Sequence, residues 1–166
     1  MSLTTELLSR SAHHCRWNLE RIEGCLAQIT EEEIWLRPNE NSLSIGNQLL
    51  HLSGNLRQWI IHSLGGKADT RERSSEFTAT EGHSKESLFA GLKNTVDAAV
   101  AAIQSLTEEE LLRERPVQAY HLSGAAALIH AVEHFSYHTG QIIFWTKQLR
   151  NQQMDFYGGQ ALDRTN

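Results

Sequence analysis

Apolar residues recur every three or four positions along most of this chain, and that helical spacing constrains its fold more than any other feature. Only two prolines occur, Pro38 and Pro116, and both fall between the segments that carry the spacing. At 166 residues the chain is long enough for one domain with a buried core. We therefore predict a single all-α domain spanning residues 1–166.

The periodic segments predict four long helices, separated by residues that end or begin helices. The helices are expected over residues of about 3–29, 44–64, 84–106 and 122–149. Thr30, followed by three glutamates, forms a capping box that begins a short helix through Trp35. The polar residues 67–83 are predicted to form a long surface connection with no more than a brief turn, and the tail 151–166 is predicted to pack loosely.

The two halves of the chain share an internal repeat. Residues 28–34 (QITEEEI) resemble residues 105–111 (SLTEEEL), and an Arg-Pro pair follows each of them. A Leu-Ser pair then precedes a histidine, His51 or His130, at the same spacing in both halves. We interpret this order as two helix pairs related by a pseudo-twofold axis, with residues 67–83 crossing over between the second and third helices. The connections within each pair predict that its two helices are antiparallel neighbours.

Three histidines, His130, His134 and His138, stand four residues apart in the last predicted helix. Positions i and i+4 share a helix face, with Cβ atoms roughly 5–6 Å apart, so two such imidazoles can bind one metal ion. The row borders the apolar stripe of its helix, where a buried ring nitrogen needs a partner. Hydrogen bonds alone could also supply that partner, so the row does not establish a metal site by itself.

A further histidine strengthens the metal interpretation. His51 lies at the polar edge of the apolar stripe on the second predicted helix, beside Gln48 and Asn55. Zinc sites with an exchangeable position use three protein ligands, and three neutral imidazoles favour zinc, nickel, copper or iron(II) over magnesium or calcium. Spacing alone does not decide whether His130 or His138 joins His134. We interpret the remaining histidines as ordinary surface or edge residues: His13, His14, His62, His83 and His121.

The composition argues against several classes of partner. The net charge is −5 and Lys and Arg do not cluster, so nucleic acid is not an expected partner. No apolar run approaches the roughly 20 residues that span a bilayer, so no membrane is expected either. The first residues lack the pattern of a signal peptide, and we expect a cytoplasmic protein.

The two cysteines, Cys15 and Cys25, both fall in the first predicted helix. Ten helical residues separate them by roughly 15 Å, which is too far for a disulfide. We expect reduced, structural thiols, and the alternative is a reactive Cys15 beside His14.

Two segments of the chain resemble the signature regions of the DinB/YfiT-like superfamily. These are residues 44–59 (SIGNQLLHLSGNLRQW) and 134–149 (HFSYHTGQIIFWTKQL). The match is closest to a subgroup of uncharacterised DinB-like proteins that carry H-L-x-G-N and Y-H-x-G-Q segments. The turn 35–40 (WLRPNE) also resembles that subgroup, so the likeness covers most of residues 1–150.

The resemblance implies a four-helix bundle of up-down-down-up order that forms a homodimer. It assigns a metal to the histidine of the first segment and the two of the second, which are His51, His134 and His138. His130 is then left as a neighbouring or packing residue. The expected cofactor is one divalent transition metal, zinc or nickel. Characterised relatives include thiol S-transferases and a mycothiol-dependent isomerase.

The expected function is that of a metal-dependent enzyme acting on a small-molecule substrate. The metal would deprotonate a low-molecular-weight thiol or a water molecule. Asn55, Tyr137 and Gln141, one helical turn from a ligand, would orient the reacting molecule. No carboxylate occupies an obvious general-base position, which favours thiol transfer over hydrolysis. The alternatives are a metal-binding or stress-related bundle without turnover, and a dimerising scaffold whose histidines only form hydrogen bonds.

Overall fold

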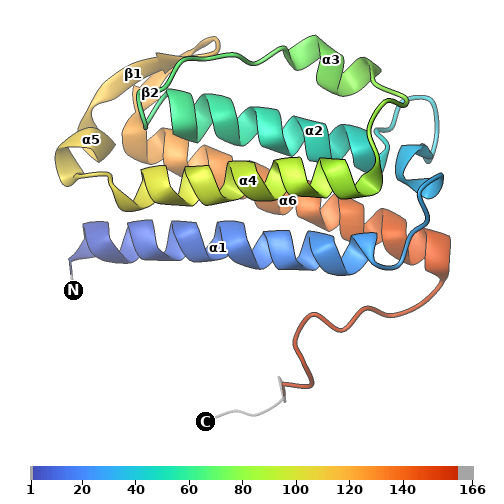
Figure 1. The fold of residues 1–166 in the computed structure, drawn as a ribbon. Helices are drawn as coiled ribbons and strands as arrows, with labels where there is room; N and C mark the ends of the chain where they lie inside the picture. Colours follow the sequence, from blue (N-terminus) through green and yellow to red (C-terminus); the bar gives the residue numbers. More distant parts are fainter. Residues whose placement is uncertain (1, 161–166) are drawn as a thin grey trace.

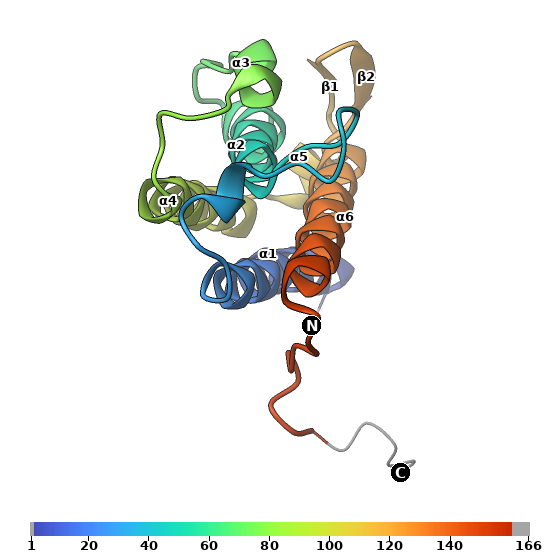
Figure 2. The same cartoon turned by 90° about the vertical axis from the view of Figure 1, so that its right-hand side faces the viewer.

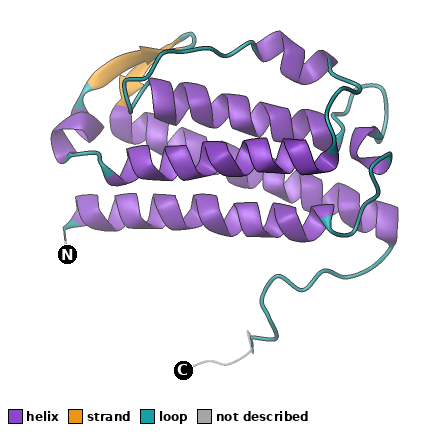
Figure 3. Cartoon of the chain, viewed as in Figure 1, coloured by secondary structure: helices purple, strands orange, loops and turns teal. Residues whose placement is uncertain are grey.

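The computed structural model describes residues 2–160, which are mostly helical with one small two-stranded sheet (Figure 3). Four long helices run side by side (Figure 1), namely α1 (Leu3–Leu26), α2 (Ile45–Leu56), α4 (Lys85–Gln104) and α6 (Gly124–Arg150). Each begins within one turn of its predicted start. The helical spacing of apolar residues therefore predicts the main elements correctly.

The four helices pack around one core, and Figure 2 shows them end-on. α1 and α6 run in one direction, and α2 and α4 run in the other (Figure 1). α1 packs against α4 and α6, and α2 packs against the same two helices, so α1 and α2 lie at opposite corners. The prediction that the helices of each pair are neighbours is therefore wrong. The connection over residues 27–44 is long enough to cross the bundle diagonally.

Side-chain caps fix where the helices begin. The Ser44 hydroxyl accepts a hydrogen bond from the Asn47 backbone N–H, and the Asn47 side chain accepts one from the Ser44 N–H, forming a capping box. Ser84 caps α4 in the predicted way. Thr30 and Glu33 form the predicted reciprocal cap, which precedes a single 3₁₀ turn, η1 (Glu33–Trp35). The corresponding short helix of the second half is α5 (Glu108–Leu112).

A β-hairpin that was not expected from the sequence precedes α6. Strand β1 (Glu114–Val117) pairs antiparallel with β2 (Tyr120–Ser123). The first two residues of the predicted last helix, 122–123, therefore belong to a strand, and Ser123 caps α6 instead. Strands of four residues are too short for an alternating pattern to stand out from the surrounding helical spacing.

The crossover between α2 and α4 is more ordered than predicted. A turn of π-helix, η2 (Arg57–His62), extends α2, and a short helix, α3 (Arg73–Thr78), packs against α2 (Figure 1). The Asn47 side chain donates hydrogen bonds to the backbone carbonyls of Glu76 and Ala79, at 3.0 and 2.7 Å. Residues 67–83 are therefore attached to the bundle and are not only a surface connection.

The core lies between the four long helices and includes large, fully buried side chains from each of them, such as Ile22, Leu52, Leu92 and Phe135. After α6, Met154 and Phe156 of the tail pack against this core. The remainder of the predicted tail, residues 161–166, lies outside the described residues. Among residues 2–160, no helix is both long and apolar enough to cross a membrane.

Candidate metal centre

Three of the predicted histidines meet between α2 and α6. One ring nitrogen from each of His51, His134 and His138 lies within 4.8 Å of the other two. The Nε2 atoms of His51 and His134 are 3.0 Å apart. His51 and His138 are buried and His134 is partly buried, so the three rings face one another beneath the surface.

The helices explain why these rings converge. α2 packs against α6, and His134 and His138 stand one turn apart on the face of α6 that borders α2. Ala131 and Phe135 next to them are fully buried in the core and fix the rotation of α6 about its axis. His51 is then placed opposite the pair because α2 presents its own apolar stripe to the same core.

His130, the other histidine left open by the spacing, takes a different position. Its ring packs on Trp59 with 3.9 Å between the ring centroids, and it lies 5.8 Å from the ring of His134. The three-nitrogen cluster does not include it. The geometry therefore pairs His134 with His138 and leaves His130 as a packing neighbour.

The buried surroundings keep the histidines of α6 uncharged. Burial is the largest cause that lowers the pKa of His134, to about 3, and the neighbouring His138 and His51 lower it further. Burial, followed by His51, lowers the pKa of His138 to about 4. Near neutral pH both rings are therefore neutral imidazoles, which is the form that binds a metal.

The chain offers these rings few alternative partners. His138 Nδ1 lies 3.4 Å from Gln48 Oε1, a long hydrogen bond. His134 Nδ1 is buried and has no hydrogen-bond partner among the described residues. Two ligand nitrogens held 2.0–2.1 Å from one tetrahedral ion stand about 3.4 Å apart, close to the 3.0 Å between His51 and His134. The donor set and its spacing fit one transition-metal ion.

Two further residues of this site lie in the crossover, residues 67–83, and could not be predicted from the sequence. Glu76 Oε2 is 2.9 Å from His51 Nδ1, on the side of the ring away from His134. Arg71 donates to both carboxylate oxygens of Glu76, and its Nη2 stands 3.3 Å from His51 Nδ1. Nothing in the polar, aperiodic sequence of residues 67–83 distinguished this glutamate from its exposed neighbours.

A cleft of about 680 Å³ opens beside His138. Its lining comes from the turn before α2, from α2 and from α6, and includes Asn39, Gln48, Tyr137, His138, Gln141 and Phe144. None of the described residues that line it carries a charged side chain. Two of the predicted orienting residues, Tyr137 and Gln141, therefore border the cleft. Asn55 is buried, and its Oδ1 has no partner among the residues described.

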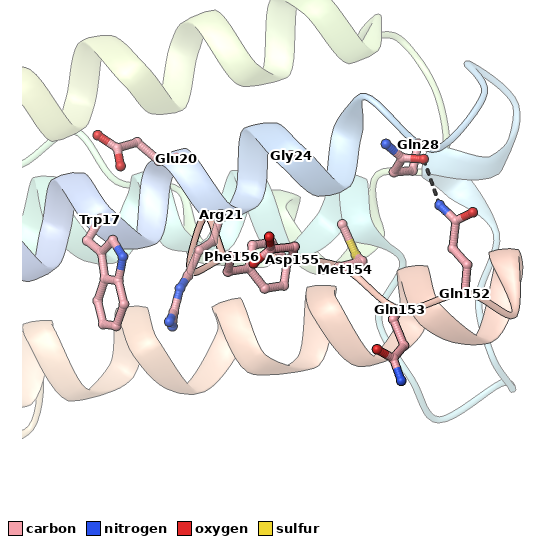
Figure 4. Close-up of a pocket in the computed structure, with 11 residues that line it drawn as sticks. Trp17, Glu20, Arg21, Gly24, Gln28, Gln152, Gln153, Met154, Asp155 and Phe156 are labelled. Carbon is pink, nitrogen blue, oxygen red and sulfur yellow. Dashed lines mark hydrogen bonds between the residues drawn. The ribbon is translucent and has the colours of Figure 1, made fainter. Parts of the chain in front are cut away.

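A second cavity is separate from the histidine cluster. It has a volume of about 390 Å³ and lies between α1 and the tail, beside Trp17, Arg21 and Phe156 (Figure 4). The Arg21 guanidinium stands 3.5 Å from the centre of a Trp17 ring. None of the three clustered histidines borders this cavity, so we do not associate it with the metal centre.

The cysteines are buried in α1, which supports the structural interpretation over a reactive Cys15. Burial raises the pKa of the Cys15 thiol to about 12 and that of Cys25 to about 11. Because the thiolate is the reactive form, we expect iodoacetamide at pH 8 to modify both thiols at least about a hundredfold more slowly in the folded protein than in urea. Timed alkylation followed by mass spectrometry checks this. Rapid modification of Cys15 without urea would restore the reactive alternative.

The chain matches one known family along most of its length. Residues 2–157 match the family model described as a protein of unknown function, DUF1572. A search of curated proteins gives no match. Because the matched range exceeds half of the chain, it establishes family membership.

Solved structures show the same fold. A DinB-like protein from Bacillus subtilis superposes with a TM-score of 0.67 at 24% identity, covering 92% of this chain and 96% of that chain. A conserved protein from Enterococcus faecalis gives 0.71 at 18% identity, over 92% and 99% of the two chains. A DinB-like protein from Bacillus cereus gives 0.66 at 16% identity, over 84% and 90%. With its matched residues the chain belongs to the DUF1572 family, and it shares the fold of these DinB-like proteins.

Proposed function

We propose that the protein binds one divalent transition-metal ion, zinc or nickel, through His51, His134 and His138. The observation that supports this most directly is that three ring nitrogens lie within 4.8 Å of one another. Burial keeps two of these rings neutral, and imidazole ligands favour zinc or nickel over magnesium or calcium. Three protein ligands leave a coordination position open for a water molecule or a substrate atom.

We further propose that the centre is catalytic and acts on a small molecule in the cleft beside His138. A bound metal would supply a Lewis acid that lowers the pKa of a coordinated water or thiol. Tyr137, Gln141 and Gln48 would orient the substrate, because they line the cleft. An open cleft with a few polar groups is typical of a ligand site and less typical of a purely structural metal site.

The lining of the cleft supports an uncharged substrate. It offers amides, a phenol and aromatic surface, and its described residues supply no cation to pair with a carboxylate or phosphate. Thiol transfer to a small electrophile, the activity that the family resemblance implies, is our proposal for the reaction. Hydrolysis is less favoured, because Glu76 faces the far side of His51 and the described residues that line the cleft include no carboxylate. A metal-binding bundle without turnover is the alternative.

We also propose the assembly and symmetry that the resemblance and the repeat imply. The directions of the helices in Figure 1 support an up-down-down-up bundle of two pseudo-twofold-related pairs. The exposed side chains of Ile129 and Phe144 on α6 support a homodimer, since they leave apolar surface on one helix. Sedimentation of the purified protein tests the oligomeric state.

Metal analysis of protein purified without an affinity tag tests the proposed centre. We expect about one zinc or nickel ion per chain, removal of that ion by a chelator, and a rise in melting temperature when it is restored, because a ligand of the folded state stabilises it. Full-length protein that contains no metal and whose melting temperature does not respond to zinc or nickel would contradict the proposal. If the metal-loaded protein binds no small ligand at the open coordination position of the metal, the alternative of a metal-binding bundle without catalytic turnover is favoured.

A further inference from the structure

A buried carboxylate from the crossover lies directly behind one of the three clustered histidines. The side chains of Glu76 and Arg71 are only 7% and 1% exposed, although both belong to a segment of polar, mostly exposed residues. Arg71 Nε binds Oε1 of Glu76 at 2.7 Å and Nη2 binds Oε2 at 2.8 Å. Such a two-point contact holds the plane and position of the carboxylate.

The position of the carboxylate determines which nitrogen of His51 carries the proton. Glu76 Oε2 lies 2.9 Å from His51 Nδ1. The Arg71 guanidinium contacts both oxygens of Glu76, and this two-point ion pair compensates the charge of an ionised carboxylate. An ionised carboxylate only accepts hydrogen bonds, so Nδ1 of the neutral ring donates to Glu76 at 2.9 Å. Arg71 Nη2 stands 3.3 Å from the same nitrogen, but it donates to Glu76 Oε2 at 2.8 Å instead. The lone pair of the ring is then on Nε2, the atom that faces His134.

A glycine makes room for this arrangement. Gly54 stands on α2 three residues after His51, against the carboxylate of Glu76. A Cβ atom at this position would overlap Oε1, stand 2.7 Å from Cδ of Glu76 and 2.9 Å from Nε of Arg71. The buried ion pair therefore requires a residue without a side chain at position 54.

The attachment of the crossover to the bundle does not depend on the Glu76 carboxylate. Asn47 holds the backbone carbonyls of Glu76 and Ala79, and Arg37 donates to the carbonyl of Phe77 at 3.0 Å. The carboxylate is thus free for a task other than holding α3 in place. The role of the Glu76 carboxylate can therefore be tested by substitution without detaching residues 67–83 from the bundle.

We propose that Glu76, held by Arg71 and accommodated by Gly54, is a positioning residue that fixes the tautomer of His51 and thereby strengthens metal binding. The inference rests on the proposed metal centre. Carboxylates that accept a hydrogen bond from a metal-binding histidine orient the ring and raise its basicity, and their loss typically weakens metal binding about 10–100-fold.

The test compares Glu76→Gln with wild type and with Glu72→Gln, which removes an exposed carboxylate from the residue preceding α3. We expect Glu76→Gln to weaken zinc binding about 10–100-fold in competition with a chromophoric chelator. Glu72→Gln should bind zinc as wild type does. Gly54→Ala should weaken binding in the same direction, because the new methyl group displaces the carboxylate.

A second readout reports the tautomer itself in the metal-free protein. Nitrogen–proton correlation spectra at pH 7.5 should show His51 protonated on Nδ1 in wild type and in Glu72→Gln, with this preference reduced in Glu76→Gln. Equal zinc affinity of Glu76→Gln and wild type, or a wild-type His51 protonated on Nε2, would overturn the positioning role. Absence of zinc and nickel binding by wild type would instead refute the proposed centre, so the two failures are distinct.

Discussion

Replacing His134 with alanine is expected to weaken zinc binding by more than about 100-fold. Loss of a residue that hydrogen-bonds to a metal-binding side chain typically weakens metal binding about 10–100-fold, and loss of one of the three ligands themselves should weaken it more. His134 is the member of the cluster whose Nε2 lies 3.0 Å from His51 Nε2 and whose ring neighbours His138. Chelator competition on the purified variant measures the affinity, and circular dichroism verifies that the variant is folded.

His130→Ala is the matched control for this experiment. It removes a histidine from the same helix, one turn away, whose ring packs on Trp59 instead of joining the cluster. We expect it to keep zinc affinity within a few fold of wild type. If His130→Ala lost zinc and His134→Ala retained it, the ligand set proposed here would be wrong.

The positions of the helices and the three histidines could be predicted because they follow from local spacing. A period of 3.6 residues fixes which side chains share a face, and it placed His134 and His138 one turn apart before any packing was known. His51 was assigned from its place on the apolar edge of another helix. The choice between His130 and His138 required either the resemblance or the observed rotation of α6.

Two of the features that could not be predicted depend on contacts between segments far apart in the sequence. Glu76 reaches His51 across 25 positions of sequence, from a stretch with no apolar period to reveal a buried face. The hairpin of β1 and β2 is held by pairing between its own strands. Strands of four residues are too short to show an alternating pattern in the sequence. The diagonal placement of α1 and α2 results from how the connection crosses the bundle, and connection length alone suggested neighbours.

These missed contacts change the chemistry expected of the site. From the sequence, no carboxylate occupies an obvious general-base position near the histidines. In the structure one is present, but it binds Arg71 and the far nitrogen of His51 instead of facing the cleft. Because Arg71 already compensates the charge of Glu76, this carboxylate is better suited to orienting His51 than to transferring a proton.

The metal-free protein is expected to lose stability steeply as the pH falls from about 6 to about 4. The pKa values of His134 and His138 are lowered from 6.5 to about 3 and about 4, chiefly by burial. In this window the unfolded chain binds protons at both rings while the folded protein does not, so acid favours unfolding. Each ring contributes at most about 1.4 kcal/mol per pH unit, or about 2.7 kcal/mol together. Urea unfolding at a series of pH values measures the slope.

Single substitutions separate the buried rings from other acid-sensitive groups. His134→Gln should reduce the slope between pH 6 and pH 4 by up to about 1.4 kcal/mol per pH unit, because it removes a ring that binds a proton only in the unfolded chain. His121→Gln, which removes an exposed histidine of the hairpin, should leave the slope unchanged. The lowered pKa of Glu76 adds a loss at still lower pH, as its carboxylate becomes protonated. If stability depends on pH no more steeply in wild type than in His134→Gln, the ring of His134 is not buried as a neutral imidazole. The proposed metal centre would then lack one of the neutral ligands that it requires.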